Sequence, residues 1–258
     1  MLKTLLQCPV CHQPLYLTHH YSCGKHHFDR AKEGYVNLCI PPIRGDDTLL
    51  VNARANFFQT NPYKPLMVKL QSMVASFSTV LDVGCGTGAY LEFMKRNDST
   101  LTTIGCDGSK KAIRKAAKLD TQTLYIVANM NALPLLNESV DVILSVFAPY
   151  NSEEIQRVLK PNGQLIVVQP APNHLFELKQ VLYDIVKLNP DTTLTIPGLT
   201  SNLNEQLEFE MILNQDELQA LFAMTPYVYT SSQQASMKLK ALVSLNIKAS
   251  FKISVFTK

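Results

Sequence analysis

The chain has 258 residues, of which 46% are hydrophobic and 17% are charged, so it can bury one full α/β core and carry a small second domain. It contains no apolar run of the ~20 residues that a membrane helix needs, and its first residues lack the long apolar region of a signal peptide. We therefore expect a cytoplasmic protein and no membrane partner. The net charge is only +3, and residues 1–45 hold the whole excess, so the basic patch is modest.

The six cysteines are placed unevenly, with three of them in the first 23 residues. Cys8 and Cys11 form a CxxC turn, and Cys23 is followed closely by two histidines, so each turn can present two ligands to one tetrahedral ion. This pattern predicts a zinc site rather than a disulfide framework. The fourth ligand is His26 if the second turn is read as CxxH and His27 if it is read as CxxxH; we favour His26. Because so short a segment cannot build its own core, metal binding would supply much of its folding energy.

A break in composition separates this segment from the rest of the chain. Two prolines end it at residues 41–42, and residues 43–52 form a polar, turn-rich linker, so we place the domain boundary between residues 42 and 43. Helices are expected over residues 52–59 and 66–77, the second with a broad apolar stripe.

The stretch TVLDVGCGTGAY, residues 79–90, predicts a cofactor loop. Residues 80–83 indicate a short buried strand, and the glycines Gly84, Gly86 and Gly88 predict a tight turn before a helix that begins near residue 90. A glycine-rich turn alone also fits a dinucleotide site or a corner without a ligand. Asp82 favours S-adenosylmethionine (SAM) over both of these alternatives. A carboxylate at the strand end repels a pyrophosphate, whereas it can hold the cationic amino-acid group of SAM.

Strands and helices alternate from residue 79 onward, which predicts parallel βαβ units. The second strand, residues 102–106, ends at Asp107, where a carboxylate is expected to bind the ribose hydroxyls. The third strand, residues 124–128, is followed by Asn129, whose side chain could reach the adenine ring. A helix over residues 109–118, capped by Ser109, carries a run of cations that is typical of a solvated face, with RNA backbone contact as the alternative.

The second half of the chain continues the same pattern and then weakens. Strands are expected over residues 140–146 and 164–168, with a short helix over residues 153–159 between them, and another helix begins near His174. Phe147 and Tyr150 follow the central strand, where ligands bind in open α/β sheets. Further expected elements are strands over 209–213, 227–229 and 245–256 and a helix over 215–222.

These motifs together resemble the 23S ribosomal RNA guanine-N1 methyltransferase family. The resemblance runs nearly end to end and rests on CPVC, CGKHHFDRAKEGYVNL, NPYKPL, LDVGCGTG, APY, LKPNG, PAPNHLFELK and MTPY, in that order. It implies a class I SAM-dependent methyltransferase fold, with a seven-stranded sheet whose last strand is antiparallel, after a small zinc-binding domain that helps to grip RNA. It also implies zinc on Cys8, Cys11, Cys23 and a histidine. The chain departs from the family in its second zinc knuckle, which is one residue shorter, and this leaves His26 and His27 as alternatives.

The resemblance assigns SAM contacts to Tyr63, Gly86, Thr87 and His174, and it implies a homodimer in many members. We therefore expect an enzyme that methylates N1 of a guanine in a hairpin loop of 23S rRNA, with residues 1–42 for RNA recognition and 43–258 for methyl transfer. Phe147, Tyr150 and Tyr63 are candidate walls for an unpaired guanine. No catalytic base is assigned; His174 is the nearest titratable candidate. The alternatives are a small-molecule methyltransferase, which has little use for a basic zinc module, and a non-catalytic zinc-ribbon module, which would not bind SAM.

Overall fold

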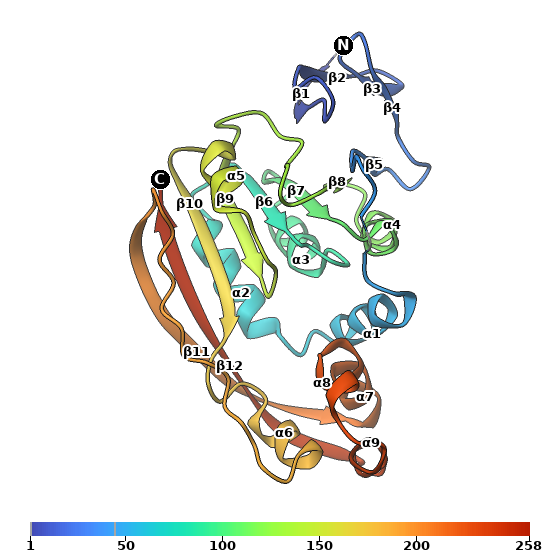
Figure 1. Ribbon diagram of the computed structural model, residues 1–258, viewed down its shortest axis with the longest axis vertical. Helices are drawn as coiled ribbons and strands as arrows, with labels where there is room; N and C mark the ends of the chain where they lie inside the picture. Colours follow the sequence, from blue (N-terminus) through green and yellow to red (C-terminus); the bar gives the residue numbers. More distant parts are fainter. Residues whose placement is uncertain (1, 44) are drawn as a thin grey trace.

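The computed structural model describes residues 2–43 and 45–258. Its N-terminal part is a small four-stranded antiparallel sheet in the order β1-β2-β3-β4, which we call the zinc ribbon. Tight turns join its short strands, which span Leu2–Gln7 (β1), Pro14–Leu17 (β2), His20–Ser22 (β3) and His27–Asp29 (β4). Figure 1 shows these strands at one end of the molecule, beyond β8, with the last helices at the other end.

The main sheet has eight strands in the described part of the chain, in the order β11-β12-β10-β9-β6-β7-β8-β5. Strands β5 to β10 pair in parallel, whereas β12 is antiparallel to both β10 and β11. These strands span Val36–Asn37 (β5), Thr79–Val83 (β6), Thr102–Asp107 (β7), Leu124–Val127 (β8), Val140–Val146 (β9), Leu159–Pro170 (β10), Thr200–Asn214 (β11) and Ser244–Thr257 (β12).

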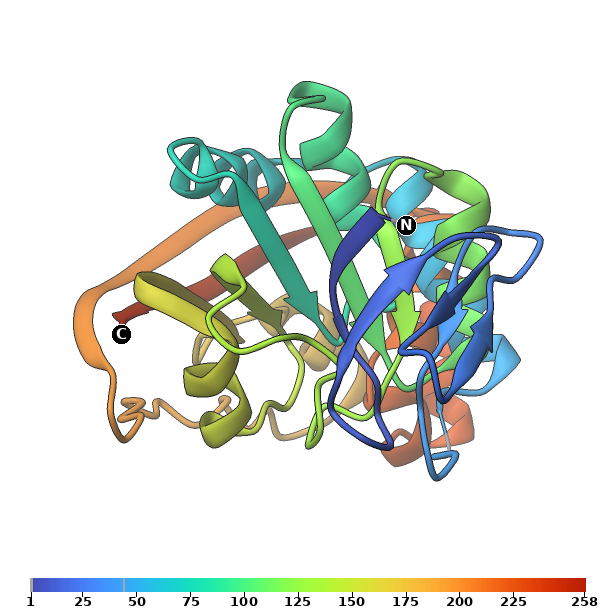
Figure 2. The same ribbon diagram turned by 90° about the horizontal axis from the view of Figure 1, so that it is seen from above.

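Two hydrophobic clusters fill the two faces of this sheet. The larger cluster joins the inward residues of α1, α2, α3, α4, α6, α7 and α9 to one set of strand side chains. The other joins the alternate strand side chains to α5 and to Leu6, Leu15 and Tyr21 of the zinc ribbon. Seen from above, α2 and α3 lie on one side of the central strands, and α5 and the zinc ribbon lie on the other (Figure 2). The zinc ribbon therefore covers part of a sheet face, as a helix does elsewhere.

The predicted helices begin and end close to the expected positions, and a helix over Gln233–Lys240 was not predicted. Asp47 caps α1 by accepting from the backbone N–H of Leu50, so this helix begins earlier than predicted, and Ser109 caps α4 as predicted. The helices span Thr48–Gln59 (α1), Lys64–Val74 (α2), Ala89–Asn97 (α3), Lys110–Leu119 (α4), Ser152–Val158 (α5), Phe176–Leu182 (α6), Gln215–Met224 (α7), Tyr227–Thr230 (α8) and Gln233–Lys240 (α9). None of the helices in residues 2–43 and 45–258 is long and apolar enough to cross a membrane.

Three expectations differ from the structure. Residues 227–229 form the helical turn α8 rather than a strand, because Pro226 starts a turn there in αR conformation and Ser231 N–H closes it on the Tyr227 carbonyl. The part of the chain from residue 79 supplies the seven predicted strands, and β5, which comes from within the predicted zinc-binding segment, adds an eighth. The main sheet thus begins before the predicted boundary at residues 42 and 43.

The cations of α4 lie at the surface, as expected, and three of them also make specific contacts. Lys111 donates to the Thr48 hydroxyl at 2.8 Å, and Lys115 donates to the Asn52 side chain at 2.9 Å. Arg114 forms an ion pair with Glu33 at 2.8 Å. Three cations of this run therefore bind α1 and the segment before β5, which anchors the linker to the main sheet.

Candidate active site and metal centre

The two turns of the zinc ribbon bring four potential metal ligands together. The ligand atoms of Cys8, Cys11, Cys23 and His26 all lie within 4.8 Å of one another. His26 Nδ1 is 3.5 Å from the sulfurs of both Cys8 and Cys23, and the sulfurs of Cys11 and Cys23 are 3.6 Å apart. A tetrahedral ion with Zn–S bonds of about 2.3 Å and Zn–N bonds of about 2.0 Å requires ligand separations of about 3.5 to 3.8 Å. The cluster therefore fits zinc in size and in ligand type.

His27, the alternative fourth ligand, points away from this cluster. Its Nδ1 lies 2.9 Å from Nε2 of His20, and the two rings meet edge to face. Cys23 is also prepared for metal binding: its pKa falls to about 6, because backbone N–H groups at Lys25 and His26 outweigh the upward effect of burial. A thiolate is the form of cysteine that binds metal.

The second candidate site surrounds the loop between β6 and α3. A cavity of about 430 Å³ opens there, within the size range of small-molecule sites. The loop must be glycine-rich: a Cβ at Gly84 would lie 2.4 Å from the Ala148 Cβ, and Gly86 has a φ of +53°. Cavity-lining residues include the predicted Tyr63, Asp82, Gly84, Gly86, Thr87 and His174.

Asp82 is the most unusual group in this cavity. Its side chain is 1% exposed, and neither carboxylate oxygen has a hydrogen-bond partner within residues 2–43 and 45–258. Burial, with a further contribution from the negative charge of Asp107, raises its pKa to about 7. A buried carboxylate without a partner is costly, and a cationic ligand group would remove that cost. The residues present thus fit the ammonium of an amino-acid ligand.

Asp107 and Asn129 occupy different surroundings. Asp107 accepts from the backbone N–H groups of Gly86 at 2.9 Å and Ser109 at 2.7 Å, so it braces the glycine loop against the N-terminus of α4. Asn129 does not line the 430 Å³ cavity; it accepts from the backbone N–H of Asn131 and lines a groove beside the zinc ribbon. Gly88, which starts α3, does not line the cavity either. The adenine contact of Asn129 and the ribose contact of Asp107 stay predictions.

An aromatic cluster closes the cavity on the side of β12. Tyr63 packs edge to face against Phe57 and Phe251, with ring centroids 5.0 and 5.1 Å apart, and its ring is 6.3 Å from that of His174. Burial lowers the pKa of His174 to about 4, and its Nδ1 accepts from the backbone N–H of Ser250. His174 is thus neutral near pH 7 and a weak proton acceptor, which suits a wall of the site better than a general base.

Phe147 and Tyr150 lie in different places, although both follow β9. Phe147 is in the left-handed conformation, with φ +54°, and its half-exposed ring lines the cavity at 5.7 Å from the rings of His174 and Phe251. Tyr150 packs against the cluster on the other face of the sheet and does not line the cavity. Of these two predicted walls, the structure brings only Phe147 to the site.

Residues that were not predicted also line the cavity, among them Arg54, Tyr90, Asn189 and Tyr227. Arg54 is the one charged residue of TLLVNARANFFQ, the sequence of α1, and it lies between two buried alanines. A lone arginine in such a helix is a signal that could have identified it. Tyr90 belongs to the predicted cofactor stretch, residues 79–90, whereas Asn189 and Tyr227 reach the cavity through contacts between distant segments.

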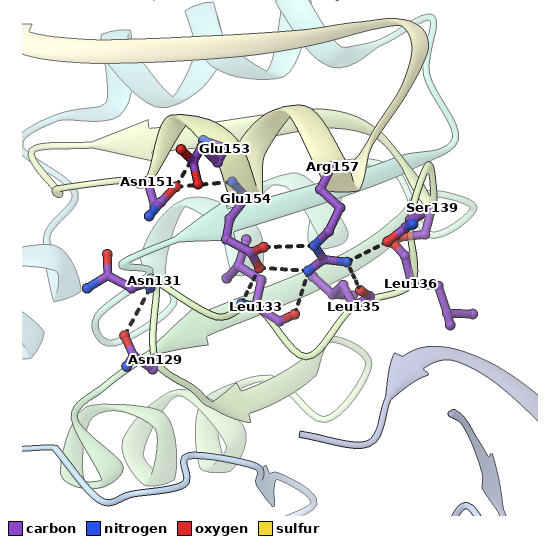
Figure 3. A network of polar contacts seen from close by, with 11 residues as sticks. Asn129, Asn131, Leu133, Leu135, Leu136, Ser139, Asn151, Glu153, Glu154 and Arg157 are labelled. Carbon is purple, nitrogen blue, oxygen red and sulfur yellow. Dashed lines mark hydrogen bonds and ion pairs between the residues drawn. The ribbon is translucent and has the colours of Figure 1, made fainter. Parts of the chain in front are cut away.

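A polar network fixes the loop that carries Asn129 and supports the zinc ribbon (Figure 3). The Arg157 guanidinium pairs with Glu154 at 2.7 Å and donates to the carbonyls of Leu133 and Leu135. The zinc ribbon is hydrogen-bonded to the same loop: the Gln7 N–H donates to the Pro134 carbonyl, and the Leu136 N–H donates to the Leu5 carbonyl. The groove between the two parts measures about 630 Å³.

Comparison with known proteins agrees with this organisation. Residues 6–42 match the family model described as "RlmA, N-terminal", and residues 81–167 match the model described as "Methyltransferase domain". The fold and the two matches define a class I SAM-dependent methyltransferase with an N-terminal zinc ribbon.

Named relatives identify the family more narrowly. The chain is 33% identical to a 23S rRNA (guanine(748)-N(1))-methyltransferase of Streptomyces fradiae, covering 86% of this chain and 84% of the relative. It is 28% identical to a Bacillus subtilis (strain 168) protein that carries the provisional name 23S rRNA (guanine-N(1)-)-methyltransferase YxjB, covering 95% and 94%. The chain belongs to the 23S rRNA (guanine-N1) methyltransferase family, which confirms the resemblance and the expected cofactors, SAM and zinc.

Proposed function

We propose that this chain transfers the methyl group of SAM to N1 of a guanine in a hairpin loop of 23S rRNA. The single observation that carries the proposal is the exposure of Phe147. This side chain is 46% exposed, whereas its neighbours Tyr63, His174 and Phe251 are nearly buried, and it stands on the wall of the cavity that contains the glycine loop. An exposed aromatic ring beside a cofactor site provides a stacking surface for an unpaired base.

Each residue of the site has a role in this proposal. Asp82 holds the cofactor ammonium, Tyr63 and His174 close the apolar wall, and Asp107 keeps the glycine loop in place. Bound SAM supplies an electrophilic methyl group. Phe147 stacks on the guanine and orients N1, which must lose its proton and therefore must be free of Watson–Crick pairing. No residue is assigned as the base that accepts this proton.

The zinc ribbon contributes binding rather than chemistry. Four protein ligands leave no open coordination position for substrate, so the ion at Cys8, Cys11, Cys23 and His26 would be structural. Residues 1–45 carry five basic and two acidic residues, and we assign RNA contact to the exposed Lys25, Arg30 and Lys32. With rRNA as substrate we also propose a cytoplasmic location, and a homodimer is proposed from the family resemblance alone.

The test uses the purified chain, SAM with a labelled methyl group and hairpins transcribed from 23S rRNA. We expect label on one loop guanine, with mass mapping and primer-extension arrest placing the methyl group at N1. A hairpin with adenine in place of that guanine is the control. Methylation of another guanine atom, or of small molecules but no RNA, would contradict the proposal, and the second result would favour a small-molecule methyltransferase.

Changing Phe147→Ala tests the stacking surface. Because base stacking on an aromatic ring contributes about 1 to 3 kcal/mol, kcat/KM for the hairpin should fall about 5- to 150-fold while SAM affinity stays unchanged. Tyr229→Ala is the matched control, since Tyr229 is also an exposed aromatic residue but lies outside the cavity. Equal values of kcat/KM for both variants would contradict the assignment of Phe147 to the substrate site.

A further inference from the structure

Arg54 lines the cofactor cavity and forms an ion pair with Asp46. It comes from α1, and its Nη1 donates to Asp46 Oδ2 at 2.9 Å. The same nitrogen lies so close to the glycine loop that a Cβ at Gly86 would be 3.1 Å from it. The guanidinium therefore reaches the loop that the cofactor must contact.

The cavity lining carries one acidic side chain and one cation of fixed charge among the described residues. Asp82 supplies a buried negative charge, and among the described cavity-lining residues Arg54 is the only cation of fixed charge, because His174 has a pKa of about 4. The methionine part of SAM carries an ammonium and a carboxylate on one carbon atom. Asp82 accounts for the first group, and a planar guanidinium binds the second with two parallel hydrogen bonds.

We propose that Arg54 binds the α-carboxylate of the cofactor's methionine moiety and takes it in exchange for the side chain of Asp46. This inference rests on the proposed function and adds the residue that distinguishes SAM from cofactor analogues without the carboxylate. Asp46 serves as the counterion of Arg54 until the cofactor enters.

The position of Asp46 suits such an exchange. Its side chain is 38% exposed and that of Arg54 is 29% exposed, so their pair is partly hydrated and weaker than a buried one. The neighbouring anchors do not depend on it: Asp47 keeps its cap on Leu50 N–H, and Lys111 keeps its bond to Thr48. Asp46 can thus release Arg54 without unfolding the first turn of α1.

The experiment compares two ligands by calorimetry with the full-length chain: SAM and decarboxylated SAM, which keeps the sulfonium and the ammonium. The intact chain should bind SAM roughly 10- to 100-fold more tightly than the decarboxylated ligand, because the latter cannot form the charge-assisted bond. Arg54→Gln should reduce this ratio to about twofold while affinity for decarboxylated SAM is kept. Arg96→Gln, an exposed arginine on α3 outside the cavity, is the matched control.

Asp46→Asn is a second, independent variant for this experiment, and it leaves Arg54 unchanged. Removal of the competing carboxylate should raise SAM affinity several-fold and increase the ratio between the two ligands. If Arg54→Gln fails to fold, which circular dichroism reports, Arg54→Lys replaces it and should give an intermediate ratio. An unchanged ratio in Asp46→Asn, or equal loss of both ligands in the Arg54 variant, overturns the exchange. A chain that binds neither ligand rejects the proposed function itself, whereas equal binding of both by the intact chain rejects only the role of Arg54.

Discussion

The zinc ribbon and the main sheet are stabilised in different ways. In β6 every residue from Thr79 to Val83 is buried, and side chains pack against it from both faces of the sheet. The zinc ribbon buries only a few large side chains, such as Leu6, Leu15 and Tyr21, and those contact the main sheet as well as one another. We therefore expect a segment with four short strands and little interior to depend on its metal ligands and on its neighbour for stability, whereas the main sheet is held by its own core.

The largest expected effect is the loss of structure in the zinc ribbon when zinc is removed. Structural zinc binding contributes about 10 to 16 kcal/mol in small zinc-finger peptides, so a chelator should unfold residues 2–29 while the main sheet stays folded. Hydrogen–deuterium exchange with mass spectrometry should report loss of protection in β1 to β4 and retained protection in β6 and β9.

The two neighbouring histidines give a matched pair for the same experiment. His26→Ala should lower the zinc content of the purified chain, and His27→Ala should leave it at one ion per chain, because only His26 lies in the cysteine cluster. Zinc analysis by mass spectrometry measures both. The reverse order, or a zinc ribbon that stays protected without metal, would contradict this account.

Asp82→Asn tests a residue of the well-packed main sheet. Loss of the charge should weaken SAM binding by about 1.5 to 3 kcal/mol. In the intact protein SAM affinity should rise from pH 6 to pH 8, since the carboxyl group with a pKa of about 7 must ionise, and the variant should lose this dependence. Calorimetry at several pH values measures both effects. Unchanged SAM affinity in the variant would contradict the assignment of Asp82 to the cofactor site.

The same substitution should stabilise the cofactor-free protein. The pKa of Asp82 is raised in the folded state, so the folded state holds the proton more tightly than the unfolded chain does. Stability from this group is therefore complete below pH 4 and is lost as pH rises through about 7. Asp82→Asn should raise the melting temperature at pH 8 and change it little at pH 4, and Asp191→Asn, an exposed carboxylate, is the control. A lower melting temperature at pH 8 would contradict this reasoning.

The smallest effect should come from the surface of the zinc ribbon. Replacing Lys25, Arg30 and Lys32 by alanine should weaken hairpin binding and reduce the slope of log affinity against log salt by about 0.7 for each phosphate that is no longer neutralised, or about 2 in all. SAM affinity should not change. A second triple variant at Arg96, Lys118 and Lys240, which are also exposed, should keep the original slope. Equal slopes for both variants would leave the zinc ribbon without a role in RNA binding.

Periodicity and spacing predicted the parts of the molecule that depend on local sequence. The strand β9 has the predicted bounds, Ser109 caps α4, and the cofactor loop follows β6, because a buried apolar run and a capping side chain each depend on a few neighbouring residues. The two zinc turns were predicted for the same reason.

Features that need contacts between distant segments were not predicted. Val36–Asn37 pairs with β8 in the main sheet, and Arg54 reaches the glycine loop from α1. Tyr227 has strong strand propensity but lies in a helical turn, since Pro226 decides the local backbone. Whether His26 or His27 faces the cysteines depends on how the chain passes from the second turn into β4. The spacing of the residues alone did not decide between them.

The hydrogen bonds between the zinc ribbon and residues 134–136 have a consequence for synthesis of the chain. The zinc ribbon leaves the ribosome before the main sheet does, and the loop on which it docks, together with the strand β8 that pairs with β5, follows about a hundred residues later. Contacts of such long range form late. During that interval Leu6 and Leu15 have no sheet to cover them, so early metal loading would keep the nascent segment compact and out of contact with other chains.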